Sequence, residues 1–192
     1  MMTSSKSICI AGAGSIGCFV GGCLAAGGHH VLLLARRGTC DAIAAHGLRL
    51  TGYEGMDEHV PAARLTLSDD PAILQHADVV IVTVKGGDTA AIAELIAAHA
   101  RPDVPVISLQ NGVDNVGLLH ASLPGRRVLG GMVPFNVVAQ GDGHYHRATS
   151  GDIVLENDPS ALAEQLSVPL LAMQTTRDIA GVQWGKLIIN LN

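Results

Sequence analysis

The chain has 192 residues, of which 48% are hydrophobic, 15% charged and 3% aromatic. This composition is typical of a globular protein and excludes a disordered chain or a coiled coil, and the length predicts one full domain and part of another. The formal net charge is −5, with 12 Lys and Arg against 17 Asp and Glu, so we expect no nucleic-acid partner.

The first forty residues contain all the cysteines and a long uncharged segment. Cys9, Cys18, Cys23 and Cys40 match neither a zinc site nor a CxxC pair, and we interpret them as reduced, buried apolar side chains. The uncharged residues 7–28 include seven glycines, which makes a signal peptide or membrane span a poor interpretation. We therefore expect no membrane partner and a cytoplasmic protein.

Strands and helices alternate through the first two thirds of the chain. Short apolar runs predict strands at Ser7–Ala11, Val31–Ala35, Asp78–Val84 and Val104–Leu109. Apolar residues at helical spacing predict helices at Ile16–Leu24, Asp88–Ala100 and Val116–Ser122. Thr39 is a candidate cap for a short helix that ends at Gly47, and Leu48–Val60 resembles an edge hairpin. The alternation predicts an α/β fold, a Rossmann-like, doubly wound and mostly parallel sheet covered by helices.

The alternation of predicted strands and helices ends after Arg127. Val128–Pro134 is predicted to be a last sheet strand, and the glycine-rich Asn136–Glu156 to form added antiparallel hairpins. We expect a helix at Ser160–Leu166, a strand at Ala172–Arg177 and a further helix from Gly181 onward.

A glycine loop joins the first predicted strand to the first helix. Its GAGSIG sequence comprises Gly12, Ala13, Gly14, Ser15, Ile16 and Gly17. In a dinucleotide-binding loop, Gly12 would permit the tight turn, Gly14 the approach of a pyrophosphate, and Gly17 close packing of helix on strand. The alternative is a glycine-rich turn without a ligand.

The end of the second strand bears on which dinucleotide would bind. NAD-binding chains place a carboxylate there, whereas this chain has Arg36 and Arg37. A guanidinium can bind a 2′-phosphate through two hydrogen bonds, so NADP is favoured, with Arg36 as the better candidate. An ordinary basic turn is the alternative.

Polar residues that follow strongly apolar strands are candidates for the site itself, because ligands of such sheets lie beyond the carboxyl ends of the strands. Lys85 and Asn111 occupy such positions. Lys186 and Asn190, four residues apart, share one face of the last predicted helix, although a surface pair is an equally good interpretation. His144 and His146 could share a strand face as metal ligands, but no third ligand is visible and we expect no metal.

The motifs GAGSIG, ARRG, VTVK, ISLQNGVDN and WGKLIINLN, in this order, resemble those of the ketopantoate reductases, also called 2-dehydropantoate 2-reductases. The resemblance runs from Ser7 to Asn192, and QNG followed about seventy residues later by KLxxN is its most specific part. It implies NADPH-dependent reduction of ketopantoate to pantoate, on the route to pantothenate and coenzyme A.

The resemblance also implies roles for individual residues. Gly12–Gly17 match the dinucleotide loop, Arg36 the 2′-phosphate contact, and Lys85, Asn111 and Asn136 the cofactor contacts. Asn111 and Asn190 match substrate ligands, and Lys186 matches the catalytic proton donor. It further implies that residues 1–178 form the NADP-binding domain and that 179–192 begin a helical substrate domain, which in the family supplies a further Asn, Ser and Glu.

Two other functions remain open from the sequence. One is an NADP-binding module or sensor without turnover, which the shortness of the second domain favours. The other is an oxidoreductase that acts on a different oxo acid or an imine. A homodimer is a possible assembly, since an incomplete second domain would expose an apolar face.

Overall fold

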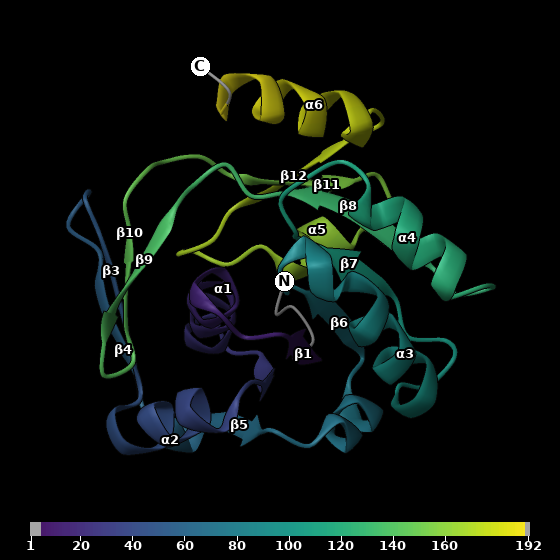
Figure 1. The fold of residues 1–192 in the computed structure, drawn as a ribbon. Helices are drawn as coiled ribbons and strands as arrows, with labels where there is room; N and C mark the ends of the chain where they lie inside the picture. The colour runs from purple at the N-terminus through teal and green to yellow at the C-terminus, as the bar shows by residue number, and fades with distance from the viewer. Residues whose placement is uncertain (1–4, 191–192) are drawn as a thin grey trace.

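The computed structural model describes residues 5–190, except for the side chain of Asn190. Its centre is an eight-stranded sheet in the order β12-β11-β8-β7-β6-β1-β2-β5 (Figure 1). The strands are β1 (Ser7–Ala11), β2 (His30–Leu34), β5 (Leu65–Ser68), β6 (Val79–Val82), β7 (Val106–Ser108), β8 (Val128–Met132), β11 (Ile153–Glu156) and β12 (Met173–Thr176).

The six strands from β5 to β8 are parallel and have the strand order of a dinucleotide-binding fold. β11 is antiparallel to β8, and β12 is parallel to β11. The predicted Rossmann-like, mostly parallel sheet is therefore confirmed.

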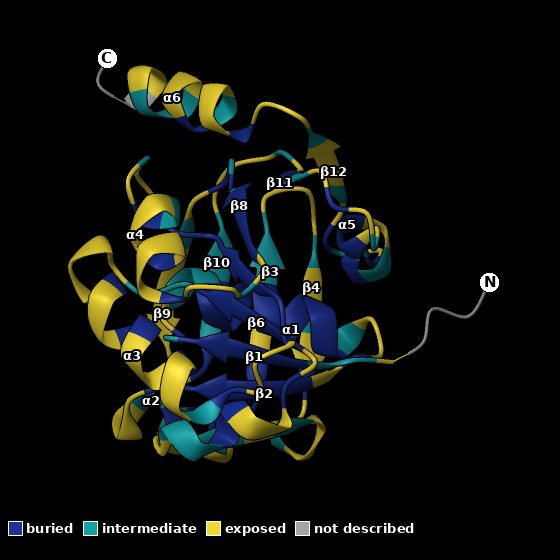
Figure 2. Ribbon diagram, turned by 90° about the vertical axis from the view of Figure 1, so that its right-hand side faces the viewer, coloured by how far each residue is buried: buried dark blue, intermediate teal, exposed yellow. Residues whose placement is uncertain are grey.

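Helices cover both faces of this sheet, and β1 shows why its sequence is apolar throughout. Ile8 and Ile10 pack on the face that carries α1 (Ser15–Ala26). Cys9 and Ala11 lie on the opposite face, in an apolar cluster that includes residues of α3 (Thr89–His99) and α4 (Asn115–Ser122). A strand buried on both faces needs no polar alternation, and Figure 2 shows β1, β2 and β6 buried.

A second sheet covers α1 on its other side (Figure 1). Its four strands lie in the order β4-β3-β10-β9, with β3 at Leu48–Gly52, β4 at Asp57–Val60, β9 at Val137–Gly141 and β10 at His144–Arg147. Since α1 lies between two sheets, nine of its twelve residues are buried. All four cysteines are free and buried, as predicted.

The remaining elements are short or lie at the periphery. The helices are α2 (Arg37–His46), α5 (Leu162–Leu166) and α6 (Ile179–Asn190), and the 3₁₀ turns are η1 (Ala62–Arg64), η2 (Pro71–His76) and η3 (Gly86–Asp88). α6 packs on β8 and β11, and much of its surface is exposed (Figure 2). No helix among residues 5–190 is long and apolar enough to cross a membrane.

The predicted edge hairpin of residues 48–60 is confirmed by the antiparallel strands β3 and β4, with β4 at an edge of the second sheet. Two other sequence expectations were wrong in detail. α2 begins at Arg37 with Arg36 as its N-cap, so Thr39 is inside the helix and caps nothing. Only β9 and β10 form a hairpin within 136–156, since β11 pairs with β8 and β12.

Candidate active site

The glycine loop has the backbone that its sequence predicts. Gly12 has a φ of +89°, and a Cβ there would overlap the Val84 side chain. At Gly17 a Cβ would lie 2.5 Å from the Thr83 hydroxyl and 2.9 Å from Ile10 Cγ2. A Cβ at Gly14, by contrast, would meet nothing within 4 Å. Gly12 and Gly17 are thus required by the fold, whereas Gly14 keeps the outer surface of the loop open.

The loop ends at an uncapped helix N-terminus. Gly14 is the N-cap of α1, no side chain of the described residues caps the helix, and its first turn carries no acidic residue. The first intrahelical bond runs from the Cys18 N–H to the Gly14 carbonyl, at 2.8 Å. The preceding helical N–H groups therefore have no intrahelical acceptor, and with the helix dipole they favour an anion beside Gly14.

Arg36 and Arg37 differ in their partners. The Arg37 guanidinium donates to Asp41 at 3.1 Å and lies 3.9 Å from Asp69. The Arg36 side chain is exposed and has no hydrogen bond or ion pair within the described part of the chain. Of the two cations at the end of β2, Arg36 is thus the one available to an external anion.

Lys85 and Asn111 lie at equivalent positions on neighbouring strands. Val82 of β6 is paired with Ser108 of β7, and each site residue follows its strand's paired residue by three positions. Both side chains are exposed at the carboxyl edge of the sheet. The structure therefore places both where the sequence predicted.

Lys186 extends from α6 to this same edge. Its ammonium donates to Asn111 Oδ1 at 2.7 Å and to the Val133 carbonyl. Gln183, one turn earlier, fixes α6 by donating to the Gly131 carbonyl at 3.0 Å. Partial burial lowers the pKa of Lys186 below its usual value, because desolvation penalises the charged form.

The two other asparagines are less defined by the structure. Asn136 is exposed just before β9, and its backbone N–H donates to the Thr149 hydroxyl at 2.9 Å. Its side chain makes no hydrogen bond within residues 5–190. Asn190 ends α6, and its side chain lies outside the described part of the structure.

Sequence reasoning missed a buried polar cluster beneath Lys85 and Asn111. The cluster consists of Thr89, Ser108, Gln110 and Asn115, which are all buried. Its signal was present in the sequence, since the polar residues Ser108 and Gln110 lie two apart where an apolar strand ends.

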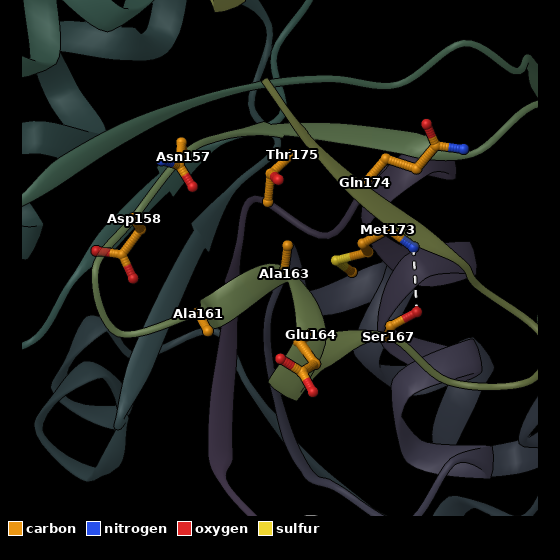
Figure 3. Close-up of a pocket in the computed structure, with 9 residues that line it drawn as sticks. All are labelled: Asn157, Asp158, Ala161, Ala163, Glu164, Ser167, Met173, Gln174 and Thr175. Carbon is orange, nitrogen blue, oxygen red and sulfur yellow. Dashed lines mark hydrogen bonds between the residues drawn. The ribbon is translucent and has the colours of Figure 1, made fainter. Parts of the chain in front are cut away.

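Two other polar features lie away from this edge. His144 Nε2 and His146 Nδ1 both contact the Thr51 hydroxyl, at 2.8 and 2.9 Å, so they share a strand face as expected. A cavity of about 400 Å³ between α5 and β12 has a polar lining that includes Asp158 and Glu164 (Figure 3). The Asp158 carboxylate is already bonded to Arg127 and Ser160, and none of the predicted site residues lines the cavity.

The chain is similar in sequence to known reductases and dehydrogenases. The family model described as ketopantoate reductase PanE/ApbA matches residues 8–160. The 2-dehydropantoate 2-reductase of Halobacterium salinarum is 27% identical over 192 residues, covering 96% of this chain and 62% of the relative. The glycerol-3-phosphate dehydrogenase of Desulfovibrio desulfuricans is 26% identical over 201 residues, covering 99% and 58%.

The fold has close counterparts among solved structures. The crystal structure of a PanE/ApbA family ketopantoate reductase from Ralstonia eutropha superposes with a TM-score of 0.86 at 35% identity. That match covers 96% of this chain and 61% of the other. The chain thus spans about three fifths of the length of the relatives it matches.

Proposed function

The chain belongs to the ketopantoate reductase PanE/ApbA family, and on that premise we propose that it carries the NADPH site and the proton-donating lysine of a 2-keto acid reductase. The substrate that its relatives' names favour is 2-dehydropantoate, which would be reduced to pantoate for pantothenate and coenzyme A. The observation that carries the proposal is the 2.7 Å bond between the Lys186 ammonium and Asn111 at the carboxyl edge of the sheet.

The residues present fit a phosphorylated dinucleotide. The open surface at Gly14 and the uncapped α1 N-terminus suit the pyrophosphate. The guanidinium of Arg36, which has no partner among the described residues, suits the 2′-phosphate, and Lys85 and Asn136, both exposed, are further cofactor contacts in this proposal. NADPH would supply the hydride that reduces the substrate carbonyl.

In this proposal the protein's side chains stabilise the charge that develops on the substrate oxygen and supply one proton. As the carbonyl carbon is reduced, its oxygen gains negative charge that the Lys186 ammonium stabilises and then neutralises by donating a proton. Because Asn111 Oδ1 accepts from Lys186, the Asn111 NH₂ group points its hydrogens elsewhere and is free to donate to the substrate or cofactor. Asn190, one turn beyond Lys186, is assigned as a second substrate ligand.

The domain assignment is part of the same proposal. Residues 1–178 form the NADP-binding domain, and residues 179–192 form the start of a helical substrate domain. The boundary falls between β12 and α6, where the chain leaves the sheet and crosses to the edge that holds Lys85 and Asn111.

A second candidate differs in substrate. The match to a glycerol-3-phosphate dehydrogenase favours an oxo compound other than a keto acid, such as dihydroxyacetone phosphate. The two candidates share the cofactor site and differ only in what lies against Lys186 and Asn111.

The test is an NADPH oxidation assay on a panel of 2-keto acids and dihydroxyacetone phosphate, ketopantoate included. We expect ketopantoate to be the preferred substrate, and Lys186→Met to slow turnover by about 10²- to 10⁴-fold, the usual contribution of general acid catalysis. Lys6→Met, remote from the sheet's carboxyl edge, is the matched control. Binding of NADPH without oxidation by any substrate would instead identify a binding module, and undiminished turnover in Lys186→Met would contradict the assignment of the proton donor.

A further inference from the structure

The buried cluster of Thr89, Ser108, Gln110 and Asn115 holds the backbone on both sides of Lys85. Gln110 Nε2 donates to the Val84 carbonyl at 3.2 Å, directly before Lys85. The Thr89 hydroxyl donates to the Gly86 carbonyl at 2.8 Å, directly after it. Lys85 therefore lies on a short segment in which buried side chains bind the carbonyl groups of both neighbouring residues.

The same cluster holds Asn111. Asn115 Nδ2 donates to the Asn111 carbonyl at 2.8 Å. Asn115 Oδ1 lies 2.8 Å from the Thr89 hydroxyl, which in turn accepts from Gln110 Nε2 at 2.8 Å. With the bond from Ser108 to Gln110 and the bond from Lys186 to Asn111, a continuous hydrogen-bonded path joins β7 to the ammonium of Lys186.

Thr89 is the centre of this path. Its oxygen accepts one bond and its single hydrogen is shared between two acceptors at equal distance, the Gly86 carbonyl and Asn115 Oδ1. No buried side-chain nitrogen or oxygen of the described residues lacks a partner. Removing this hydroxyl would take one hydrogen bond from each of three groups, the Gly86 carbonyl, Asn115 Oδ1 and Gln110 Nε2. Movement of the exposed loops that the cluster holds would let these groups find new partners at the lowest cost in free energy.

We propose that Thr89, Gln110 and Asn115 are positioning residues. They hold Lys85 and Asn111 in the positions that binding of the cofactor and substrate requires. The inference rests on the proposed function, because it concerns the same edge of the sheet. A polar cluster is expensive to bury, and here its outward bonds go to the peptides around the two site residues.

The first test is a double-mutant cycle on NADPH affinity, measured by fluorescence titration. Thr89→Val keeps the shape and removes the hydroxyl, and we expect it to weaken NADPH binding about tenfold, as Lys85→Ala does. The double variant should bind little more weakly than either single variant, because both changes remove the same contact. Thr89→Ser restores the hydroxyl and should restore affinity.

The second test needs no ligand. The Asp88 N–H donates to the Lys85 carbonyl at 2.8 Å, so its hydrogen exchange reports on the order of this segment. We expect exchange of the Asp88 N–H to accelerate about tenfold in Thr89→Val, because loss of the Thr89 hydrogen bonds makes local opening of the segment easier. Exchange should stay unchanged in Thr89→Ser. Ile153→Val, a core change in β11 of similar expected cost to stability, is the control and should leave both readouts unchanged.

The outcomes separate the two proposals. Additive losses in the cycle, or unchanged exchange of Asp88, would overturn the positioning role while leaving the NADPH site in place. A wild-type chain that does not bind NADPH would overturn the proposed function and this inference together. If Thr89→Val does not fold, Asn115→Ala, which frees only the Asn111 carbonyl and the Thr89 hydrogen, takes its place in a cycle with Asn111→Ala.

Discussion

Gly12 and Gly14 lie two residues apart in one loop, yet a methyl group would meet different surroundings at each. At Gly12 it would collide with Val84 in a backbone of positive φ, and at Gly14 it would enter open space. The first glycine serves the fold and the second leaves room for whatever approaches the helix N-terminus.

This contrast gives the first residue-scale prediction. Gly14→Ala should change the free energy of unfolding by less than about 0.5 kcal/mol, as surface changes do, while weakening NADPH binding at least tenfold through contact with the pyrophosphate. Gly12→Ala should destabilise the protein by more than about 2 kcal/mol, because a collision adds to backbone strain. Urea unfolding and NADPH titration of both variants check this, and weak binding without loss of stability in Gly12→Ala would contradict it.

A second residue-scale prediction concerns Lys186 and pH. Its pKa in the folded protein is lowered by burial, whereas in the unfolded chain it returns to its usual value near 10.5. Between these two values the unfolded state binds more protons, so this residue's contribution to stability rises with pH.

The wild-type chain should therefore gain stability relative to Lys186→Met as the pH increases toward 10.5. Urea unfolding of both proteins across alkaline pH measures the difference between their free energies of unfolding. The buried thiols, whose raised pKa values have the opposite effect on stability, are present in both proteins and cancel from this difference. A difference that is flat or falls with pH would show that the ammonium is not desolvated.

At the scale of elements, α1 is confined between two sheets by glycines on opposite sides. A Cβ at Gly21 would lie 2.9 Å from Leu33 of β2, and one at Gly22 would lie 2.8 Å from Leu50 of β3. The helix can thus approach both sheets closely. Glycine is normally unfavourable inside a helix, and here close packing offsets that cost.

Gly22→Ala should accordingly destabilise the protein by about 1–3 kcal/mol, the usual cost of overpacking. Gly117 is the matched control, because it lies on the exposed side of α4 and a Cβ there would meet nothing within 4 Å. Gly117→Ala should stabilise by about 0.5–1 kcal/mol through helix propensity alone. Equal effects of the two changes in thermal unfolding would show that α1 is not tightly confined.

How far the elements follow from sequence depends on where their apolar surfaces lie. β1, β6 and α3 were predicted closely because their apolar runs have sharp ends. β5 was not predicted, because Leu65–Ser68 is short and only half-buried at the edge of the sheet. The pairing of β11 with β8 depends on contacts between distant segments, and no local pattern in residues 136–156 encodes that choice.

The candidate site was predicted only in part, for a similar reason. Residues that end strands or share a helix face, such as Lys85 and Lys186, follow from local pattern and from the family resemblance. The bonds from Thr89 and Asn115 to the loops depend on how two helix N-termini meet, which a linear sequence does not reveal.

At the scale of the whole molecule, the candidate ligand groups lie along the carboxyl edge of the parallel strands. Arg36 follows β2, Gly12 follows β1, Lys85 follows β6 and Asn111 follows β7, in the spatial order of the strands themselves. α6 then brings Lys186 to the end of this row. Under the proposed function, an extended dinucleotide would lie along this row with its 2′-phosphate at Arg36 and its nicotinamide near Asn111.

Ligand-induced stabilisation of the whole chain tests this orientation. NADPH at a hundred times its Kd should add about 2.7 kcal/mol, which raises Tm by about 5–10 °C for a chain of this size. NADH should give a smaller shift at the same concentration, and Arg36→Ala should reduce the NADPH shift to that of NADH. Arg37→Ala is the control, since Arg37 is bonded to Asp41. Equal shifts by the two nucleotides in the wild type would contradict the role of Arg36.

The sequence contains a single tryptophan, Trp184, and it lies on α6 two residues before Lys186 with 53% of its surface exposed. Its emission therefore comes from one known place, the helix that completes the row of candidate ligand groups. Reduced nicotinamide absorbs where indole emits, so energy transfer from this indole would report how close the bound ring comes to α6. The distance between α6 and a bound nicotinamide ring can thus be measured in the unlabelled protein.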